Sequence, residues 1–140
     1  MSKSIIIDSG FWFALFNARD SYHENALLYF DDIILHTLVI PWPTLYETLN
    51  TRFSRRQSWI KEFHRVIKSH SVCYIPDDNY REISLDHFFL ANQRYSLVDI
   101  IIRNILKDDS IKIDAILTFN ESDFIDLCYK KGIEVLMANN

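Results

Sequence analysis

Short runs of apolar residues alternate along this chain with longer segments in which apolar residues recur every three to four positions. The short runs are typical of strands buried on both faces of a parallel sheet, and they cover residues 5–7, 38–40, 72–75, 115–118 and 133–137. The longer segments predict helices at residues 11–17, 20–30, from 44 onward, 59–69, 78–93, 96–106 and 120–130. Strands that alternate with helices predict one doubly wound α/β domain over residues 1–140, with a mainly parallel sheet of four to five strands flanked by helices.

Four acidic residues stand just beyond predicted strands or at the starts of predicted helices. Asp8 follows the first strand, and Glu47 lies in the first helical turn after the second. Asp99 is at the start of an apolar helix, and Asp123 stands just past the fourth strand. Taken singly, each is best explained as a helix cap that accepts a backbone N–H hydrogen bond. Three capping boxes are predicted, at Thr44 with Glu47, Ser96 with Asp99, and Asn120 with Asp123.

The same carboxylates would converge if these strands are parallel neighbours, because ligands of open α/β sheets bind beyond the carboxyl ends of the strands. Capping does not require such convergence. Carboxylates that lie close together raise one another's pKa unless a cation neutralises them. Oxygen ligands without His or Cys suit Mg²⁺ or Mn²⁺, which can activate water for attack on phosphorus. The pattern predicts metal-assisted phosphodiester hydrolysis.

The charge of the chain is unevenly distributed. A net charge of −4 argues against non-specific nucleic-acid binding by the overall field. Residues 51–75, however, contain six basic residues and one acid, Glu62. The basic residues are Arg52, Arg55, Arg56, Lys61, Arg65 and Lys68. Such an excess can follow a phosphate backbone, and a solvated helix face is the simpler alternative.

Cysteine usage and the absence of targeting segments suggest a cytoplasmic protein. Cys73 and Cys128 have no CxxC spacing and no nearby histidine cluster, so we expect buried, reduced thiols and neither a disulfide framework nor a zinc site. The first residues lack the features of a signal peptide, and no run approaches 18 apolar residues. We therefore expect no membrane association.

Four stretches carry a resemblance to a known family: IIIDSGFWFALFNARDSYHENA, VIPWPTLYETLN, YSLVDIII and DAILTFNESDF. They resemble the PIN domain, the PilT N-terminus ribonuclease fold, and particularly the VapC-type toxins of bacterial toxin–antitoxin pairs. The stretches extend over nearly the whole chain. No single one is specific, whereas their ordered series within 140 residues is fairly specific.

The resemblance assigns roles to the acidic residues. It implies that Asp8 and Asp99 bind Mg²⁺ or Mn²⁺ and that Glu47 completes the acidic pocket. Many members have Asp where this chain has Asn120, so the fourth acidic role passes to Asp123. All four carboxylates are thus candidate catalytic and metal-binding residues. The accessory candidates are Asn120 and Ser9.

The resemblance also implies a PIN-like fold and an activity. It suggests an endoribonuclease that leaves 5′-phosphate and 3′-hydroxyl ends, forms a homodimer and pairs with a small DNA-binding antitoxin. Arg52, Arg55 and Arg56, just beyond the helix of Glu47, are candidate RNA contacts.

Two other functions stay open. The first is an inactive PIN-like domain that binds RNA or protein, which Asn120 keeps possible. The second is a phosphoryl-transfer domain, such as a receiver or a haloacid-dehalogenase-like phosphatase. It is weakened because Asp8 has no D-x-D arrangement and no Lys ends a late strand.

Overall fold

The computed structural model describes residues 2–90 and 94–136. Its centre is a five-stranded sheet in the order β3-β2-β1-β4-β5, in which every neighbouring pair is parallel. The strands are β1 (Ser4–Ile7), β2 (Thr37–Pro41), β3 (Val72–Ile75), β4 (Ala115–Leu117) and β5 (Glu134–Leu136). The predicted mainly parallel sheet is therefore confirmed, while Met137, the predicted end of the last strand, lies outside the described residues.

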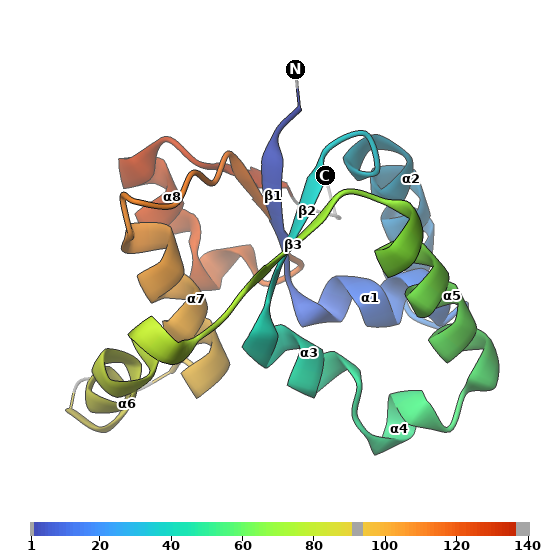
Figure 1. Ribbon diagram of the computed structural model, residues 1–140, viewed down its shortest axis with the longest axis horizontal. Coiled ribbons are helices and arrows are strands. Elements are labelled where there is room, and N and C mark those ends of the chain that lie inside the picture. Colours follow the sequence, from blue (N-terminus) through green and yellow to red (C-terminus); the bar gives the residue numbers. More distant parts are fainter. Residues whose placement is uncertain (1, 91–93, 137–140) are drawn as a thin grey trace.

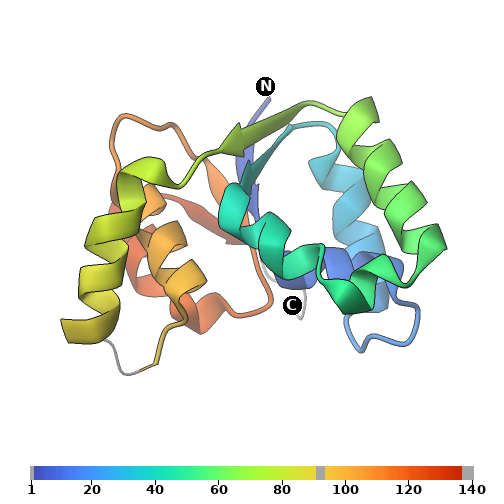
Figure 2. The same ribbon diagram turned by 60° about the horizontal axis from the view of Figure 1, so that its bottom comes forward.

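Helices cover both faces of the sheet (Figure 1). One layer contains α1 (Ser9–Phe16), α2 (His23–Ile33) and α5 (Gln57–Ser69). The other contains α6 (Arg81–Leu90), α7 (Leu97–Lys107) and α8 (Ile125–Lys131), and the 3₁₀ turns η1 (Asp78–Tyr80) and η2 (Glu121–Asp123) precede α6 and α8. Two short helices, α3 (Trp42–Thr48) and α4 (Thr51–Ser54), lie beyond the carboxyl end of β2 (Figure 2).

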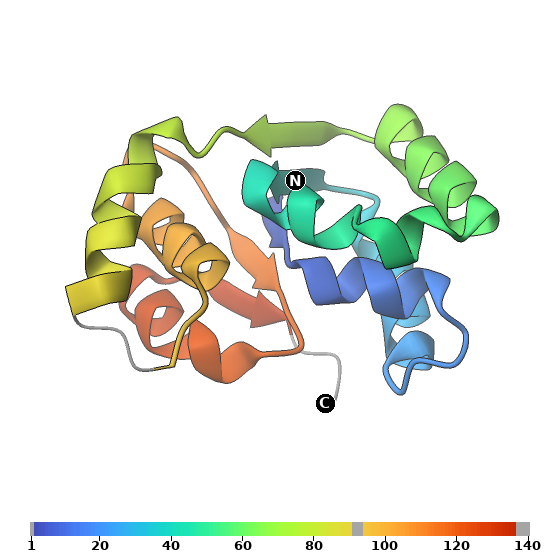
Figure 3. The ribbon, with the colours of Figure 1, turned by 90° about the horizontal axis from the view of Figure 1, so that it is seen from below.

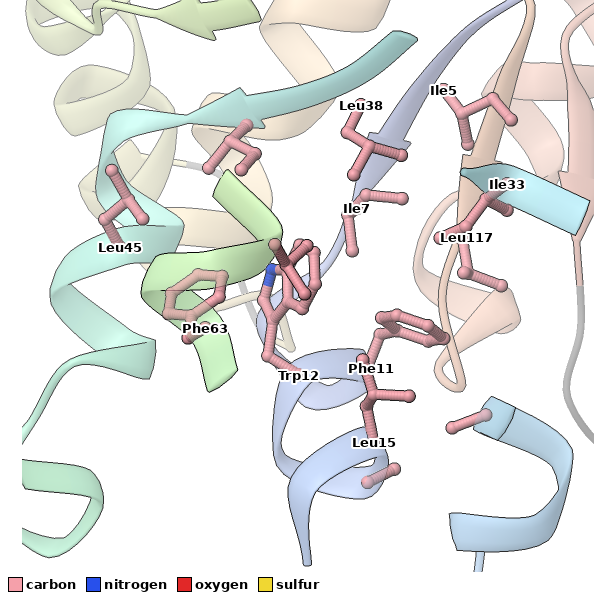
Figure 4. Packing of buried hydrophobic residues seen from close by; sticks show 14 of the residues in the cluster. Ile5, Ile7, Phe11, Trp12, Leu15, Ile33, Leu38, Leu45, Phe63 and Leu117 are labelled. Carbon is pink, nitrogen blue, oxygen red and sulfur yellow. The ribbon is translucent and has the colours of Figure 1, made fainter. Parts of the chain in front are cut away.

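The central strand β1 is buried from both sides. Ile5 and Ile7 face the layer of α1, α2 and α5, whereas Ile6 faces the layer of α7 and α8. A strand covered on both faces has no solvent side, which explains its continuous apolar run. In the first layer an aromatic cluster fills the space between the helices, with the ring centroids of Trp12 and Phe63 4.7 Å apart (Figure 4).

Most apolar residues of α6 lie outside the core. Ile83, Phe89 and Leu90 are exposed, and Phe88 is only partly buried. The residue of α6 that is fully buried is Ser84, whose hydroxyl accepts a hydrogen bond from Asn104 of α7 at 2.9 Å. Residue 93, the predicted end of this helix, lies outside the described residues.

Two predicted helix starts are also wrong. Helix α3 begins at Trp42 rather than at Thr44, and the Thr44 hydroxyl donates to the carbonyl of Pro41 at 2.7 Å. Asn120 makes no side-chain cap, and the 3₁₀ turn η2 occupies the place of the predicted first helical turn. Of the two cysteines, Cys128 is buried as expected, whereas Cys73 is exposed. Within the described residues, no helix has both the length and the apolar character needed to cross a membrane.

The packing of Phe63 predicts a large loss of stability on truncation. Its side chain is 2% exposed and contacts Trp12 and Phe53. We expect Phe63→Ala to lower the free energy of unfolding by about 3–5 kcal/mol, because it removes buried apolar surface and leaves a cavity. Urea denaturation measures this change. Leu28→Ala, at a position that is 72% exposed on α2, is the control and should change stability by less than about 0.5 kcal/mol.

Candidate active site

Asp8 lies at the carboxyl end of the central strand and is almost fully buried, with 7% of its surface exposed. It is the N-cap of α1: its Oδ1 accepts a hydrogen bond from the backbone N–H of Ser9 at 2.8 Å. Its Oδ2 accepts a second one from the hydroxyl of Thr118, just beyond β4, at 2.9 Å. The Thr118 hydroxyl in turn accepts the backbone N–H of Asn120 at 3.0 Å. The cap prediction for Asp8 is therefore confirmed, and the same contacts fix the carboxylate at the edge of the sheet.

Glu47 is tied to the start of α1. The hydroxyl of Ser9 donates to Glu47 Oε1 at 2.9 Å, although the two residues are 38 positions apart. This contact forms because β1 and β2 are parallel neighbours, so that α1 and α3 start side by side at one edge of the sheet (Figure 3). Glu47 is thus a contact of the candidate site and not part of a capping box.

Asp99 stands in the first turn of α7. There the predicted capping box is confirmed: the Ser96 hydroxyl accepts from Asp99 N at 3.1 Å, and Asp99 Oδ2 accepts from Ser96 N at 3.3 Å. Only one oxygen of Asp99 makes this contact. The cap fixes the position of the carboxylate and leaves its other oxygen outside the capping box.

Asp123 ends the turn η2, and two arginines from other parts of the chain contact it. Arg94 Nη2 lies 3.5 Å from Asp123 Oδ1 and donates to the carbonyl of Ser122 at 2.8 Å. Arg103 donates to the carbonyl of Asp123 at 2.7 Å and forms two hydrogen bonds of 2.9 Å with Asp126. These contacts bind η2 to α7 and to the segment before it.

Charge interactions connect five of the six possible pairs of these carboxylates, all except Glu47 with Asp123. Burial raises the pKa of Asp8 most, the hydrogen bonds from Thr118 and Ser9 oppose that shift, and the charges of Asp99 and Asp123 add to it. Burial also raises the pKa of Glu47, with smaller contributions from Asp8 and Asp99. The pKa of Asp99 is raised by burial and by the charge of Asp123. Burial is thus the main cause of each raised pKa, and the neighbouring charges add a smaller contribution.

The donor set suits a divalent cation by its chemistry. All four side chains offer carboxylate oxygens, which Mg²⁺ and Mn²⁺ prefer, and their mutual repulsion would be relieved by a positive ion. Within the described residues, however, no three His, Cys, Asp or Glu side chains lie close enough together to enclose a metal ion. Carboxylates in this arrangement would bind an ion with water completing its coordination, or would approach one another on binding.

The remaining candidates of the sequence occupy different surroundings. Arg52 is exposed on α4, and Arg55 and Arg56 follow it, also exposed. The Arg56 guanidinium lies 5.3 Å from the centroid of the Trp59 ring. Among the hydrogen bonds and ion pairs of the described residues, none connects these three arginines with the four carboxylates.

Three residues at the site were absent from the sequence-based candidates: Thr118, Arg94 and Arg103. Thr118 directly follows β4, and its position just beyond a central strand is a signal that could have identified it. Arg94 and Arg103 contact Asp123 across 29 and 20 residues. No local spacing relates either of them to Asp123.

This chain resembles known proteins in its three-dimensional structure. No family model matches the sequence, and no curated protein matches it. VapC20 from Mycobacterium tuberculosis, a sarcin-ricin loop cleaving toxin, is 20% identical with a TM-score of 0.69, and the match covers 87% of this chain and 94% of VapC20. A domain of a functionally unknown protein from Methanocaldococcus jannaschii is 19% identical with a TM-score of 0.54, over 97% of this chain and 91% of the other. FitAcB from Neisseria gonorrhoeae is 12% identical with a TM-score of 0.55, over 96% and 97%.

These matches extend over most of each chain and establish the fold. The five-stranded parallel sheet between helical layers is the α/β PIN-like fold that the sequence predicted, and VapC20 shares it. At 12–20% identity the likeness concerns the backbone arrangement. Activity has to be argued from the side chains of this chain.

The raised pKa of Asp8 predicts that its ionisation lowers the free energy of unfolding of the metal-free protein, by an amount that depends on pH. A carboxyl whose pKa is higher in the folded state costs no stability below its unfolded pKa; the destabilisation grows as the pH rises from the unfolded to the folded pKa and is constant above it. We therefore expect Asp8→Asn, compared with wild type in EDTA over about pH 3 to pH 8, to show a gain in stability that begins near pH 4, the ordinary aspartate pKa, and increases with pH. Urea denaturation across this range measures the difference. Asp31→Asn, in an exposed position on α2, controls for the loss of one charge; a difference that is independent of pH would contradict the assignment.

Proposed function

We propose that this protein is a divalent-metal-dependent endoribonuclease, the toxin of a cytoplasmic toxin–antitoxin pair. The observation that carries the proposal is the placement of the acidic residues at one edge of a PIN-like sheet, where Ser9 contacts both Asp8 and Glu47 and the charges of Asp99 and Asp123 act on Asp8. Carboxylates crowded beyond the carboxyl ends of parallel strands are expected where a ligand binds. A cation and a phosphodiester account for this crowding better than helix capping alone, which needs no convergence.

Each carboxylate would have a defined role. Asp8 and Asp99 would hold Mg²⁺ or Mn²⁺, with Glu47 and Asp123 completing the pocket. A bound ion would supply a water of lowered pKa and would offset charge on the leaving oxygen. Water attack on phosphorus breaks the bond to the 3′ oxygen, which leaves as a hydroxyl, while the phosphate stays on the 5′ oxygen.

The side chains around these carboxylates would keep them oriented. The Thr118 hydroxyl and the Ser9 N–H group hold both oxygens of Asp8, so its carboxylate plane is fixed before any ligand arrives. The Ser9 hydroxyl does the same for one oxygen of Glu47. Asn120, whose backbone N–H fixes Thr118, would act as an accessory residue near bound water.

RNA is the substrate class that we propose. VapC20, which shares the fold, is a toxin that cleaves the sarcin-ricin loop. In the present chain, Arg52 on α4 and Arg55 and Arg56 directly after it would contact phosphates away from the reacting bond.

A groove on the helical layer fits an antitoxin segment. It has a volume of about 310 Å³ and lies between α1, α2 and α5, with Glu62 and Arg65 among its lining residues. Its apolar residues are Leu15, Phe16, Leu27, Phe30, Trp59 and Val66. An amphipathic helix of the partner would place its apolar face there. A short upstream gene for a DNA-binding protein would support this pairing.

The alternative function is a PIN-like module that binds RNA or protein without cleaving RNA. Two observations favour it: Asn120 replaces an acid, and the described carboxylates do not enclose an ion as they stand. Calorimetric titration with Mn²⁺ separates the two functions. Absence of binding at neutral pH would support the module.

The proposed roles of Asp8 and Asp99 predict the loss of RNA cleavage. With Mg²⁺ or Mn²⁺ present, we expect Asp8→Asn and Asp99→Asn each to reduce the cleavage rate by at least about 100-fold, because each removes a charged ligand while nearly preserving side-chain shape. A fluorescent single-stranded RNA reports the rate. Asp31→Asn should cleave like wild type. Activity that survives in both site variants would exclude the assigned roles.

Exposed apolar residues on α6 predict self-association. Phe89 and Leu90 are 74% and 84% exposed, and an apolar hollow of about 450 Å³ lies between α3, α5 and the edge strand β3. Exposed apolar surface is typical of contact between proteins. We propose that a second copy of the chain covers the exposed apolar residues of α6. We expect sedimentation analysis to find a dimer that Phe89→Glu converts to a monomer. Leu28→Glu, at a similarly exposed apolar position on α2, should stay dimeric; a wild-type monomer at micromolar concentration would contradict the proposal.

A further inference from the structure

An exposed group of aromatic rings lies at the same edge of the sheet as the carboxylates. Trp42 and Tyr46 are one helical turn apart on α3 and are 41% and 70% exposed. The third ring, that of Tyr74 near the end of the edge strand β3, is also exposed. The centroid of the Trp42 ring lies 5.6 Å from that of Tyr74, with the ring planes 29° apart, and 6.3 Å from that of Tyr46. We call these three rings the aromatic platform.

The aromatic platform forms part of the wall of the apolar hollow of about 450 Å³ between α3, α5 and β3. A hollow of this size is within the range of about 300–1,000 Å³ that is usual for small organic ligands. The described residues that line it are all uncharged, and they are Trp42, Leu45, Tyr46, Leu49, Ile67 and Tyr74. The lining therefore suits a flat, uncharged group better than an ion.

The aromatic platform is connected to the candidate active site through α3. Glu47, which accepts a hydrogen bond from the Ser9 hydroxyl, directly follows Tyr46 in this helix. Figure 3 shows α3 between α1, which starts at Asp8, and the edge strand β3. Because β1, β2 and β3 are parallel, their carboxyl ends lie at one edge of the sheet, where ligands of open α/β sheets bind. An extended ligand that reaches Glu47 can therefore also reach the aromatic platform.

The charges around this edge favour the bases of an RNA over its phosphates. The chain has a net charge of −4, and the four carboxylates repel phosphate at the adjacent site. A smaller hollow of about 210 Å³, which Trp42 and Tyr46 also line, contains Arg81. Arg81 donates two hydrogen bonds to Asp77, at 3.0 and 3.1 Å, and lies 3.9 Å from Asp78, so this hollow has no excess of positive charge. Nucleobases are neutral, and every base has a π face that can stack on an aromatic ring.

We propose that the aromatic platform binds a nucleobase of single-stranded RNA by stacking, beside the carboxylate edge at which the backbone is cleaved. Trp42 presents the largest of the three rings, and Tyr74 packs against it. Stacking of this kind holds RNA on a net-acidic protein without further phosphate contacts. The inference rests on the proposed function and adds to it a binding site for the bases of the substrate.

The alternative occupant of the hollow is an apolar surface of a protein, such as a second copy of the chain. Stacking on a base requires an aromatic ring, whereas protein docking requires apolar area of any shape. Trp42→Phe keeps a ring, and Trp42→Leu keeps apolar area without a ring. A phosphate contact differs from both, since each neutralised phosphate of a single strand changes the slope of log K against log salt by about 0.7, whereas contact with a neutral base leaves the slope unchanged.

The test measures RNA binding apart from cleavage, with every protein in the inactive Asp8→Asn background. Fluorescence anisotropy with a labelled single-stranded RNA should show about tenfold weaker binding for Trp42→Leu and for Tyr46→Ala, by the same factor throughout a salt series. Trp42→Phe should recover most of the affinity. An abasic oligonucleotide of the same length should bind all these proteins with equal affinity, because it offers no base to stack.

Tryptophan fluorescence reports the stacking directly. A base stacked on an indole ring quenches its emission, so RNA should quench the protein with Trp42 more strongly than the Trp42→Phe variant. Trp12 and Trp59 are present in both proteins, so the difference in quenching belongs to Trp42. Equal quenching of the two proteins would contradict the inference.

Tyr129→Ala is the matched control, because Tyr129 is an aromatic residue that is 88% exposed but lies on α8. It should leave RNA affinity unchanged. If Trp42→Leu and Tyr46→Ala bind RNA as tightly as the protein with the platform intact, the inference is overturned. If these variants instead convert a dimer to a monomer in sedimentation analysis and keep their RNA affinity, the hollow is a contact between copies and the inference is likewise overturned.

Failure of the proposed function gives a different result. In that case wild-type protein does not cleave RNA with Mn²⁺, and Asp8→Asn protein with the platform intact does not bind it. The inference then fails together with the function. If wild-type protein cleaves RNA and the platform variants bind RNA with unchanged affinity, the inference alone fails.

Discussion

The carboxylate of Asp8 is nearly buried, and burial of a charged group is unfavourable. Much of the site depends on the hydrogen bonds that compensate for this loss of hydration. A buried carboxylate must be fully hydrogen-bonded to remain ionised. Here one oxygen accepts from the start of α1 and the other from Thr118, beyond the neighbouring strand β4. The Ser9 N–H is local to the chain, whereas the Thr118 hydroxyl reaches Asp8 only when β1 and β4 are paired in their observed register. The register of β1 and β4 therefore fixes one of the two hydrogen bonds that orient the carboxylate.

The parallel sheet explains why acidic residues from distant parts of the sequence meet. Strands that run in one direction deliver the starts of their following helices to one edge, so β1 and β2 bring Asp8 and Glu47 together through Ser9. The result opposes folding, since burial and mutual charge raise the pKa of several of these acids. Functional sites commonly retain such unfavourable contacts because a ligand relieves them. The helical layers that bury β1 on both sides supply the stability against which this cost is set.

Local patterns predicted most of the fold, and contacts between distant residues account for most of the errors. The strands were predictable because full burial leaves an apolar run, and the Ser96–Asp99 capping box because both partners lie in one turn. The Thr44–Glu47 box was wrong because Ser9, 38 residues away, binds Glu47 instead. Helix α6 was predicted at its observed place, but its buried contact uses the polar pair Ser84 and Asn104, which an apolar pattern does not reveal.

The turn η2 shows how these long-range contacts determine the shape of the site. A regular helix starting at Asn120 would follow from the sequence, yet Arg103 of α7 bonds both the Asp123 carbonyl and the Asp126 side chain. A carbonyl that accepts from a side chain in this way suits a short 3₁₀ turn followed by a separate helix. Because Arg103 lies one helical turn after Asp99 on α7, it relates the positions of Asp99 and Asp123 to each other. The spacing between these two carboxylates is therefore set by a residue that need not touch any ligand.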